Sequence, residues 1–115
     1  MITRIKPGSR MSQAVVHGNT VYLAGQVASN RSADVAGQTR EILATIDGLL
    51  AEAGTDKKHV LAATIYLTDM STFNEMNAVW DAWVAPGCAP ARATVGAPLA
   101  SSAYRVEIVI TAARD

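Results

Sequence analysis

The alternating pattern near the C-terminus, in residues 104–112, limits the folds that are open to this chain. Successive side chains of a β-strand point to opposite faces of a sheet, so the pattern has two sides. One side begins with Arg105 and Glu107 but continues with Val109. The other side is wholly apolar and consists of Val106, Ile108, Ile110 and Ala112. We therefore expect a strand of a sheet that is covered on both faces.

Five further strand patterns precede this strand, and a long helical pattern lies among them. The expected strands are residues 2–6, 12–17, 21–26, 60–67 and 92–97. Gly18-Asn19, between the second and the third of these, is typical of a hairpin turn. Over residues 35–53 apolar side chains recur at three- and four-residue steps, which predicts an amphipathic helix. Asp34 is its expected N-cap, and Gly54 follows its last turn.

A second, shorter helix is expected from Phe73, where Thr72 and Glu75 have the spacing of a capping box, to the helix breaker Pro86-Gly87. The element order is then β-β-β-α-β-α-β-β, which is an α+β class with both helices on one face of a mixed sheet. Apolar residues on the second face, such as Val109, are most simply buried against other copies of the chain. A charged share of only 17% favours the same association, and clefts between subunits are natural ligand sites.

The overall composition excludes several classes of protein. At 115 residues the chain is expected to form one domain, residues 1–115, and its ten basic and ten acidic residues are scattered along it. This distribution disfavours a nucleic-acid footprint or a basic membrane-binding face. Cys88 is the only cysteine and cannot form an intramolecular disulfide. Neither a signal-peptide pattern nor an apolar run of about 18 residues is found, so we expect a cytoplasmic protein.

Arg92 and Glu107 stand out because each lies at the start of an apolar strand pattern. A guanidinium can hold a carboxylate or phosphate through two parallel hydrogen bonds, so Arg92 is a candidate for binding a small anion. Otherwise it is a solvated edge charge or half of a structural ion pair. Glu107 is either at a solvated edge or partly buried and suited to proton handling. The two strands follow one another in the sequence, so these side chains could share a pocket at one end of the sheet.

Other polar and aromatic residues carry weaker signals. By helical spacing Asn77 faces the same side as Phe73 and Trp80, where it would either satisfy backbone groups or line a pocket. The aromatic residues of this helix have the spacing of packing side chains. His17 and His59 have no partners at metal-ligand spacing, which disfavours a metal site.

Several short segments of the chain, taken together in their order, are more specific for a protein family than any one of them alone. The segments are Val21-Tyr22-Leu23-Ala24-Gly25-Gln26, Gln38-Thr39, the helix around Asn77, Pro90-Ala91-Arg92-Ala93 and Val106-Glu107-Ile108. In this order and spacing they resemble the Rid family of reactive-intermediate enamine and imine deaminases, which is also called the YjgF family. The similarity covers almost the whole chain.

The resemblance implies a chorismate-mutase-like α+β fold, a homotrimer and three sites in the clefts between subunits. It implies hydrolysis of 2-aminoacrylate and related intermediates of pyridoxal-phosphate enzymes to 2-oxo acids and ammonia, as by a 2-iminobutanoate/2-iminopropanoate deaminase, without cofactor or metal. It also implies that Arg92 grips the substrate carboxylate and that Glu107 positions or activates the attacking water. Asn77 would lie in the same pocket, which backbone groups of Gly25 and Thr94 would line.

Three positions depart from the pattern of many deaminating members. Met11 stands in place of a tyrosine, Ala24 in place of a serine and Thr94 in place of a cysteine. The first two changes remove hydroxyl groups from the pocket, and each lost hydrogen bond is worth about 0.5–1.5 kcal/mol. We expect hydrolysis to persist with an altered substrate preference. The alternative is a non-catalytic trimeric binder or sensor of small carboxylates such as 2-oxo acids, whereas the neutral charge disfavours an RNA-cleaving role.

Overall fold

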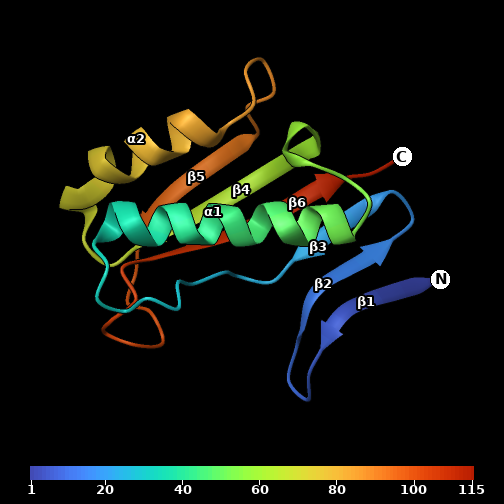
Figure 1. Ribbon diagram of the computed structural model, residues 1–115, viewed down its shortest axis with the longest axis horizontal. Helices are drawn as coiled ribbons and strands as arrows, with labels where there is room; N and C mark the ends of the chain where they lie inside the picture. The colour runs from blue at the N-terminus through green and yellow to red at the C-terminus, as the bar shows by residue number, and fades with distance from the viewer.

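The computed structural model describes residues 1–115 and consists of six strands and two α-helices (Figure 1). The order β-β-β-α-β-α-β-β and the α+β class agree with the sequence prediction. Short 3₁₀ turns at Lys57–His59 and Met70–Thr72 precede β4 and α2. The elements are β1 (Ile2–Pro7), β2 (Ser12–His17), β3 (Thr20–Leu23), α1 (Val35–Glu52), β4 (Val60–Leu67), α2 (Phe73–Trp83), β5 (Ala91–Gly96) and β6 (Val106–Ala113).

The six strands form one mixed sheet in the order β1-β2-β3-β6-β4-β5. All neighbours are antiparallel except β4 and β5, which are parallel and are joined by the crossover through α2. Parallel neighbours need such a long connection, which carries the chain back to the starting end of the sheet. The last strand, β6, pairs with β3 on one side and β4 on the other, so it is an interior strand of the sheet.

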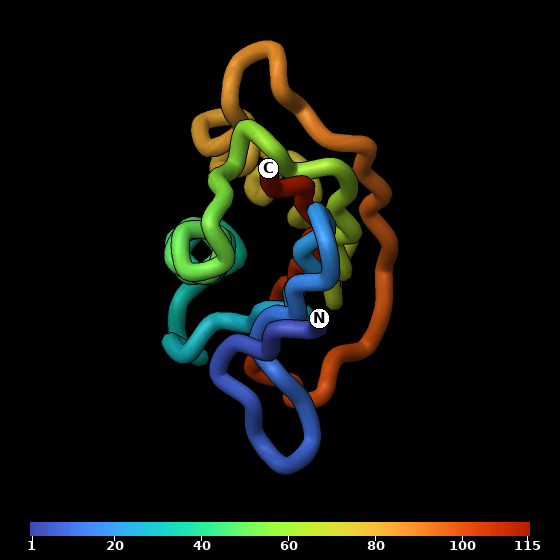
Figure 2. Tube along the Cα trace, turned by 90° about the vertical axis from the view of Figure 1, so that its right-hand side faces the viewer, coloured from blue at the N-terminus to red at the C-terminus, as the bar shows by residue number.

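Both helices cover the same face of the sheet (Figures 1 and 2). In Figure 2 α1 is seen along its axis, to one side of the strands. The first side of β6 faces these helices, and its four apolar residues are completely buried. Ile42, Ile46 and Leu50 of α1 pack into the same core at three- to four-residue steps. Neither helix combines the length and the apolar character needed to cross a membrane.

The opposite face of the sheet has no covering element in this chain. Strand register places Tyr66 of β4, Val95 of β5 and Glu107 of β6 on this open face, because Tyr66 pairs with Val95 on one side and with Glu107 on the other. Val95 is 41% exposed and Tyr22 of β3 is 51% exposed. The predicted second apolar face without helices of its own is therefore present.

Local capping agrees with the sequence at α1 and differs at α2. Asp34 accepts a hydrogen bond from the backbone N–H of Gly37 at 2.8 Å, and Gly54 beyond the last turn has a φ of 83°. The predicted capping box at α2 is wrong, because the hydroxyl of Thr72 donates to the carbonyl of Asp69 at 2.6 Å instead. Thr72 is the last residue of the 3₁₀ turn that precedes α2, so its hydroxyl bonds within that turn and does not cap the helix.

β3 ends earlier than expected, at Leu23 rather than at Gln26. The backbone N–H of Ala24 still donates to the carbonyl of Gln13 at 2.9 Å, and Gln26 then forms an isolated bridge with Ile108 of β6. The chain thus leaves the strand at Gly25 and touches the sheet again one residue later. This irregularity places Gly25 beside the open face of β6.

Candidate functional site

Arg92 lies on β5 and faces the helices, because its register partner on β4 is the buried Ala63. Its Nη1 donates to Oδ1 of Asn77 on α2 at 2.8 Å. The guanidinium carbon lies 5.3 Å from the ring centre of Trp80 and 5.9 Å from that of Phe73. The side chain is half-buried and forms no ion pair with any carboxylate of the chain. It is therefore neither a solvated edge charge nor half of a structural ion pair within one copy.

The sequence of α2 explains how these partners converge on Arg92. Phe73, Asn77 and Trp80 are spaced by four and three residues, so they share one side of the helix. Asn77 does not satisfy backbone groups, which was one of its two expected roles, but accepts from the guanidinium. Sequence reasoning treated the aromatic residues as packing side chains only and missed their contact with Arg92. Their spacing relative to Asn77 was the signal that could have revealed it.

Thr94 follows Arg92 by two residues on the same helix-facing side of β5. Its Oγ1 is buried and has no hydrogen-bond partner in the chain, and no other buried side-chain polar atom lacks one. Buried hydroxyl groups are nearly always paired, so Thr94 carries a polar group that the chain alone leaves unsatisfied.

Glu107 lies on the open face of β6, half-buried and without a hydrogen bond or an ion pair in the chain. Its carboxylate occupies the space beside Gly25, where a Cβ atom would overlap it. The neighbouring Gln26 is fixed by hydrogen bonds from its side chain to Oε1 of Gln13 and to the carbonyl of Ala24, both 3.0 Å long. The break after β3 thus forms a glycine-sized space for the carboxylate.

The structure does not bring Arg92 and Glu107 together within one copy, and the expectation of a shared pocket at one end of the sheet is wrong in that sense. β4 lies between β5 and β6, and the two side chains point to opposite faces. The reason is the parallel crossover, which places β5 at the sheet edge beyond β4. Ala24 adjoins Gly25 on the Glu107 side, and Met11, which is 49% exposed, lies in the β1–β2 connection.

A hydrogen-bond network around Gln38 connects two loops, the one that precedes α1 and the one that precedes β6. Gln38 is completely buried, and its Oε1 accepts from the backbone N–H of Arg105 at 2.8 Å. Its Nε2 donates to the carbonyls of Ala103, Ala33 and Asn30 at 3.0, 3.3 and 3.4 Å. The amide therefore ties the loop before α1 to the loop before β6.

Glu41, one turn further along α1, anchors the same loop by charge. Its carboxylate accepts from the backbone N–H groups of Ser29 and of Asn30, the second at 3.1 Å. These two hydrogen bonds hold the pKa of Glu41 below its ordinary value.

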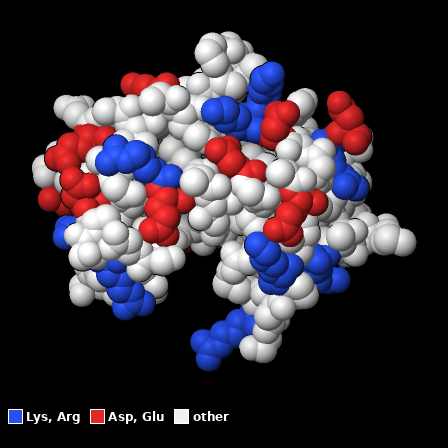
Figure 3. All heavy atoms as spheres, viewed as in Figure 1, with Lys and Arg blue, Asp and Glu red and all other residues white.

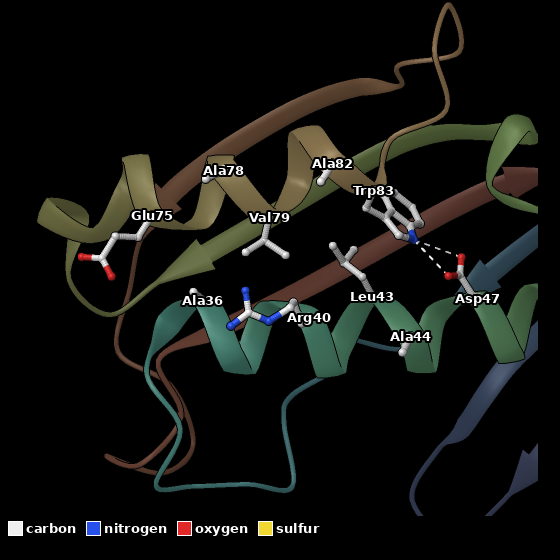
Figure 4. A pocket seen from close by; sticks show the side chains of 10 residues that line it. All are labelled: Ala36, Arg40, Leu43, Ala44, Asp47, Glu75, Ala78, Val79, Ala82 and Trp83. Carbon is white, nitrogen blue, oxygen red and sulfur yellow. Dashed lines mark hydrogen bonds between the residues drawn. The ribbon is translucent and has the colours of Figure 1, made fainter.

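The one cavity of the chain is separate from these residues. It is a groove of about 560 Å³ between α1 and α2, on the side away from the sheet (Figure 4). Leu43, Val79 and several alanines line it, and at one end Nε1 of Trp83 donates to both carboxylate oxygens of Asp47 at 3.0 and 3.2 Å. Arg92, Asn77, Thr94 and Glu107 do not line it. The single chain thus has no cavity around Arg92.

The mixed sheet with two helices on one face makes this a small protein of the α+β class. The family model described as Endoribonuclease L-PSP matches residues 1–114. A RutC family protein of Haemophilus ducreyi is 48% identical over 113 residues, which cover 98% of this chain and 97% of that protein.

Solved structures agree in fold over the whole chain. A member of the YjgF protein family from Neisseria meningitidis superposes with a TM-score of 0.97 at 50% identity, covering 100% of this chain and 96% of that one. A protein described as a putative translation initiation inhibitor, from Salmonella typhimurium, gives a TM-score of 0.90 at 45% identity over 97% and 96% of the two chains. The chain belongs to the YjgF/RutC family, which is the Rid family that its motifs resemble.

Proposed function

We propose that this protein hydrolyses reactive enamine and imine intermediates that carry a carboxylate, such as 2-aminoacrylate and its imine, to 2-oxo acids and ammonia. The active sites lie between copies of the chain in a homotrimer, where Arg92 of one copy holds the carboxylate and Glu107 of another orients the attacking water. The observation that carries the proposal is a half-buried arginine whose only hydrogen-bond partner in the chain, Asn77, is neutral.

The surroundings of Arg92 favour an anionic ligand. A partly desolvated charge is costly unless it is paired, and the chain supplies no carboxylate for this one. A guanidinium pairs with a carboxylate through two parallel hydrogen bonds. The unpaired hydroxyl of Thr94, on the same face, is placed to offer a further polar contact. A small carboxylate that also bears a polar group would satisfy both residues.

The position of Glu107 favours a site between copies. Arg92 and Glu107 are on opposite faces of one sheet, so both can reach one substrate only if a second copy contributes one of them. The open face that bears Glu107 also exposes Val95 and Tyr22, which association would bury. A repeated head-to-tail contact of the β5 edge with a neighbour's open face gives a ring when the rotation between copies closes, and the proposed trimer is such a ring.

The reaction requires a held substrate, a positioned water and a route for protons. Water adds to the electrophilic imine carbon, the tetrahedral carbinolamine then expels ammonia, and a 2-oxo acid remains. Arg92 contributes orientation by fixing the carboxylate next to that carbon. Glu107 contributes an acceptor for the water's proton and returns a proton to the leaving nitrogen. Each tenfold acceleration corresponds to about 1.4 kcal/mol, so a few well-placed groups are sufficient.

A coupled assay tests the proposal. An amino-acid oxidase generates 2-iminopropanoate from alanine, and the decay of the imine is followed with and without the protein. We expect Arg92→Ala to remove nearly all acceleration without unfolding the protein. Arg40→Ala is the matched control, because Arg40 is exposed on α1 and lies among the groove residues. Wild-type decay with Arg92→Ala would overturn the proposed role of Arg92.

A mixing experiment tests the division of the site between copies. Arg92→Ala and Glu107→Gln are each expected to be inactive alone. Copies that co-assemble at random in a ring would restore Arg92 and a neighbour's Glu107 at about one quarter of the interfaces. Recovery of activity on co-expression supports the shared site, and no recovery from a mixed assembly would show that each copy works alone.

The non-catalytic alternative keeps one observation in its favour, since Met11 and Ala24 lack the hydroxyl groups of many deaminating members. It predicts binding of a 2-oxo acid that depends on Arg92, with no faster imine decay.

The RNA-related names within the family find less support here. Ten basic residues balance ten acidic ones, and the two signs are interspersed on the helix-bearing face (Figure 3), so no basic track for a phosphate backbone is present on that face.

A further inference from the structure

The partners that α2 supplies to Arg92 are all uncharged: one amide and two aromatic rings. We propose that Asn77 and Trp80 are positioning residues, which preset the guanidinium for a carboxylate without neutralising its charge. The inference rests on the proposed function and deepens it, because it assigns the preference for a carboxylate ligand to the side of α2 that contacts Arg92.

The hydrogen bond to Asn77 leaves most of the guanidinium free. Nη1 of Arg92 donates to Oδ1 of Asn77, and no group of the chain accepts from Nη2 or Nε. Guanidinium nitrogens only donate, so the amide of Asn77 must present its oxygen to them. Nε and Nη2 together form a planar fork that matches the two oxygens of one carboxylate. We therefore predict that the bound anion occupies the Nε–Nη2 edge of the guanidinium.

Because Asn77 is neutral, Arg92 keeps its positive charge, whereas a charged acceptor at position 77 would neutralise it. An aspartate has nearly the same shape as asparagine and would keep the hydrogen bond to Nη1. It would also supply the counter-ion that Arg92 lacks, and the ligand's carboxylate would then meet a neutralised site. Asn77 thus fixes Arg92 and leaves its charge for the ligand.

Trp80 and Phe73 restrict the guanidinium in a second way. Their ring centres lie 5.3 and 5.9 Å from its central carbon, within the range of about 6 Å in which a cation is attracted to a ring face. Trp80 is itself 5% exposed and packs against Trp83 in a tilted arrangement with ring centres 5.2 Å apart, so its ring has little freedom. A long arginine side chain loses much rotamer freedom when it binds, and prior restriction reduces that loss.

The simpler reading is that these contacts only attach α2 to the edge strand. The two readings differ for Asn77→Asp, which should retain or strengthen an attachment but weaken anion binding. They also differ for Trp80→Phe, because a phenyl ring keeps a face for the cation whereas the leucine of Trp80→Leu does not.

The test measures binding of pyruvate to the full-length protein by isothermal titration calorimetry, together with imine hydrolysis in the coupled assay. We expect Asn77→Asp to weaken pyruvate binding at least about tenfold and to raise KM more than it lowers kcat. Asn77→Ala should weaken binding less than Asn77→Asp. Trp80→Leu should weaken it, and Trp80→Phe should retain most of it. Asn74→Asp is the matched control, because Asn74 is exposed on the same helix, and it should bind as the wild type does.

The outcomes separate this inference from the proposed function. Unchanged pyruvate binding by Asn77→Asp, or a larger loss for Asn77→Ala than for Asn77→Asp, overturns the positioning role even if the wild type hydrolyses imines. Pyruvate binding that shows the expected order without any hydrolysis supports the positioning role and overturns the deaminase proposal. A wild-type protein that neither binds pyruvate nor hydrolyses the imine overturns both.

Discussion

Two polar regions of this molecule differ in how completely the chain satisfies them. Around Gln38 the side-chain oxygen and nitrogen both find partners within the chain, and the residue is completely buried. Around Arg92 the charge has no counter-ion and the neighbouring hydroxyl of Thr94 has no partner. Satisfied polar groups in a core hold a fold together, whereas unsatisfied ones are stable only if something outside the chain completes them. The contrast separates the structural amide from the proposed ligand-binding residues more clearly than residue type does.

The largest expected effect is on stability, from Gln38→Leu. Leucine fits the volume but leaves the backbone N–H of Arg105 and the carbonyl of Ala103 without their partners. Each buried unsatisfied group costs about 1–3 kcal/mol, so we expect the free energy of unfolding to fall by about 2–4 kcal/mol in urea denaturation. Gln13→Leu, at a half-buried position with one side-chain hydrogen bond, should cost less. Equal losses for the two would weaken the comparison.

Gly25→Ala comes next and separates activity from stability. The added Cβ would overlap the carboxylate of Glu107, which must rotate away at a cost of about 0.5–1.5 kcal/mol. We expect stability to change by about that amount and imine hydrolysis to fall at least about tenfold, since the group proposed to orient the water is displaced. Gly48→Ala on the exposed side of α1 is the matched control, with open space at its Cβ, and should retain full activity. Full activity of Gly25→Ala would show that the position of Glu107 is not critical.

Much of the fold followed from local patterns, and the arrangement of the site did not. The periodicity of residues 35–53 and the caps Asp34 and Gly54 are local features, so the helix was predicted within a residue or two of its bounds. Helical spacing also placed Asn77 with Phe73 and Trp80. The faces of Arg92 and Glu107 depend on long-range register, which an alternating strand pattern does not specify.

The capping box and the early end of β3 show the same limit. Thr72 and Glu75 have the right spacing, but the turn that begins at Asp69 takes the threonine hydroxyl. At the break, Gly25 leaves room for the Glu107 side chain, which comes from a strand more than eighty residues later in the sequence. A competing local turn decides the first feature, and a contact with a distant strand accompanies the second, so neither follows from the spacing of the helix or strand residues alone.

Thr94→Val tests whether the unpaired hydroxyl belongs to a ligand. Valine has the same shape, and removal of a buried hydroxyl without a partner should leave the free energy of unfolding unchanged or slightly higher. Binding of a 2-oxo acid should weaken by up to about tenfold, the value of one hydrogen bond. The matched control is Thr39→Val, because Thr39 is completely buried and its hydroxyl donates to the carbonyl of Val35 at 2.7 Å. Here we expect a stability loss instead, and the reverse pattern would contradict the comparison.

The smallest effect is expected at Glu41, where an exposed carboxylate rather than a buried amide anchors the loop. Its pKa is lowered by hydrogen bonds from the N–H groups of Ser29 and Asn30, so its contribution to stability is fully present above the ordinary value of 4.5. That contribution is lost as the pH falls through the lowered pKa of the folded state, when the carboxylate takes up a proton. Wild type should therefore have a higher Tm than Glu41→Gln at neutral pH, and the difference should shrink on acidification. The matched control is Glu75→Gln, because Glu75 is exposed on α2 and its side chain forms no hydrogen bond; it should show no such pH-dependent difference. A Glu41→Gln difference that persists unchanged in acid would show that the loop does not depend on this charge.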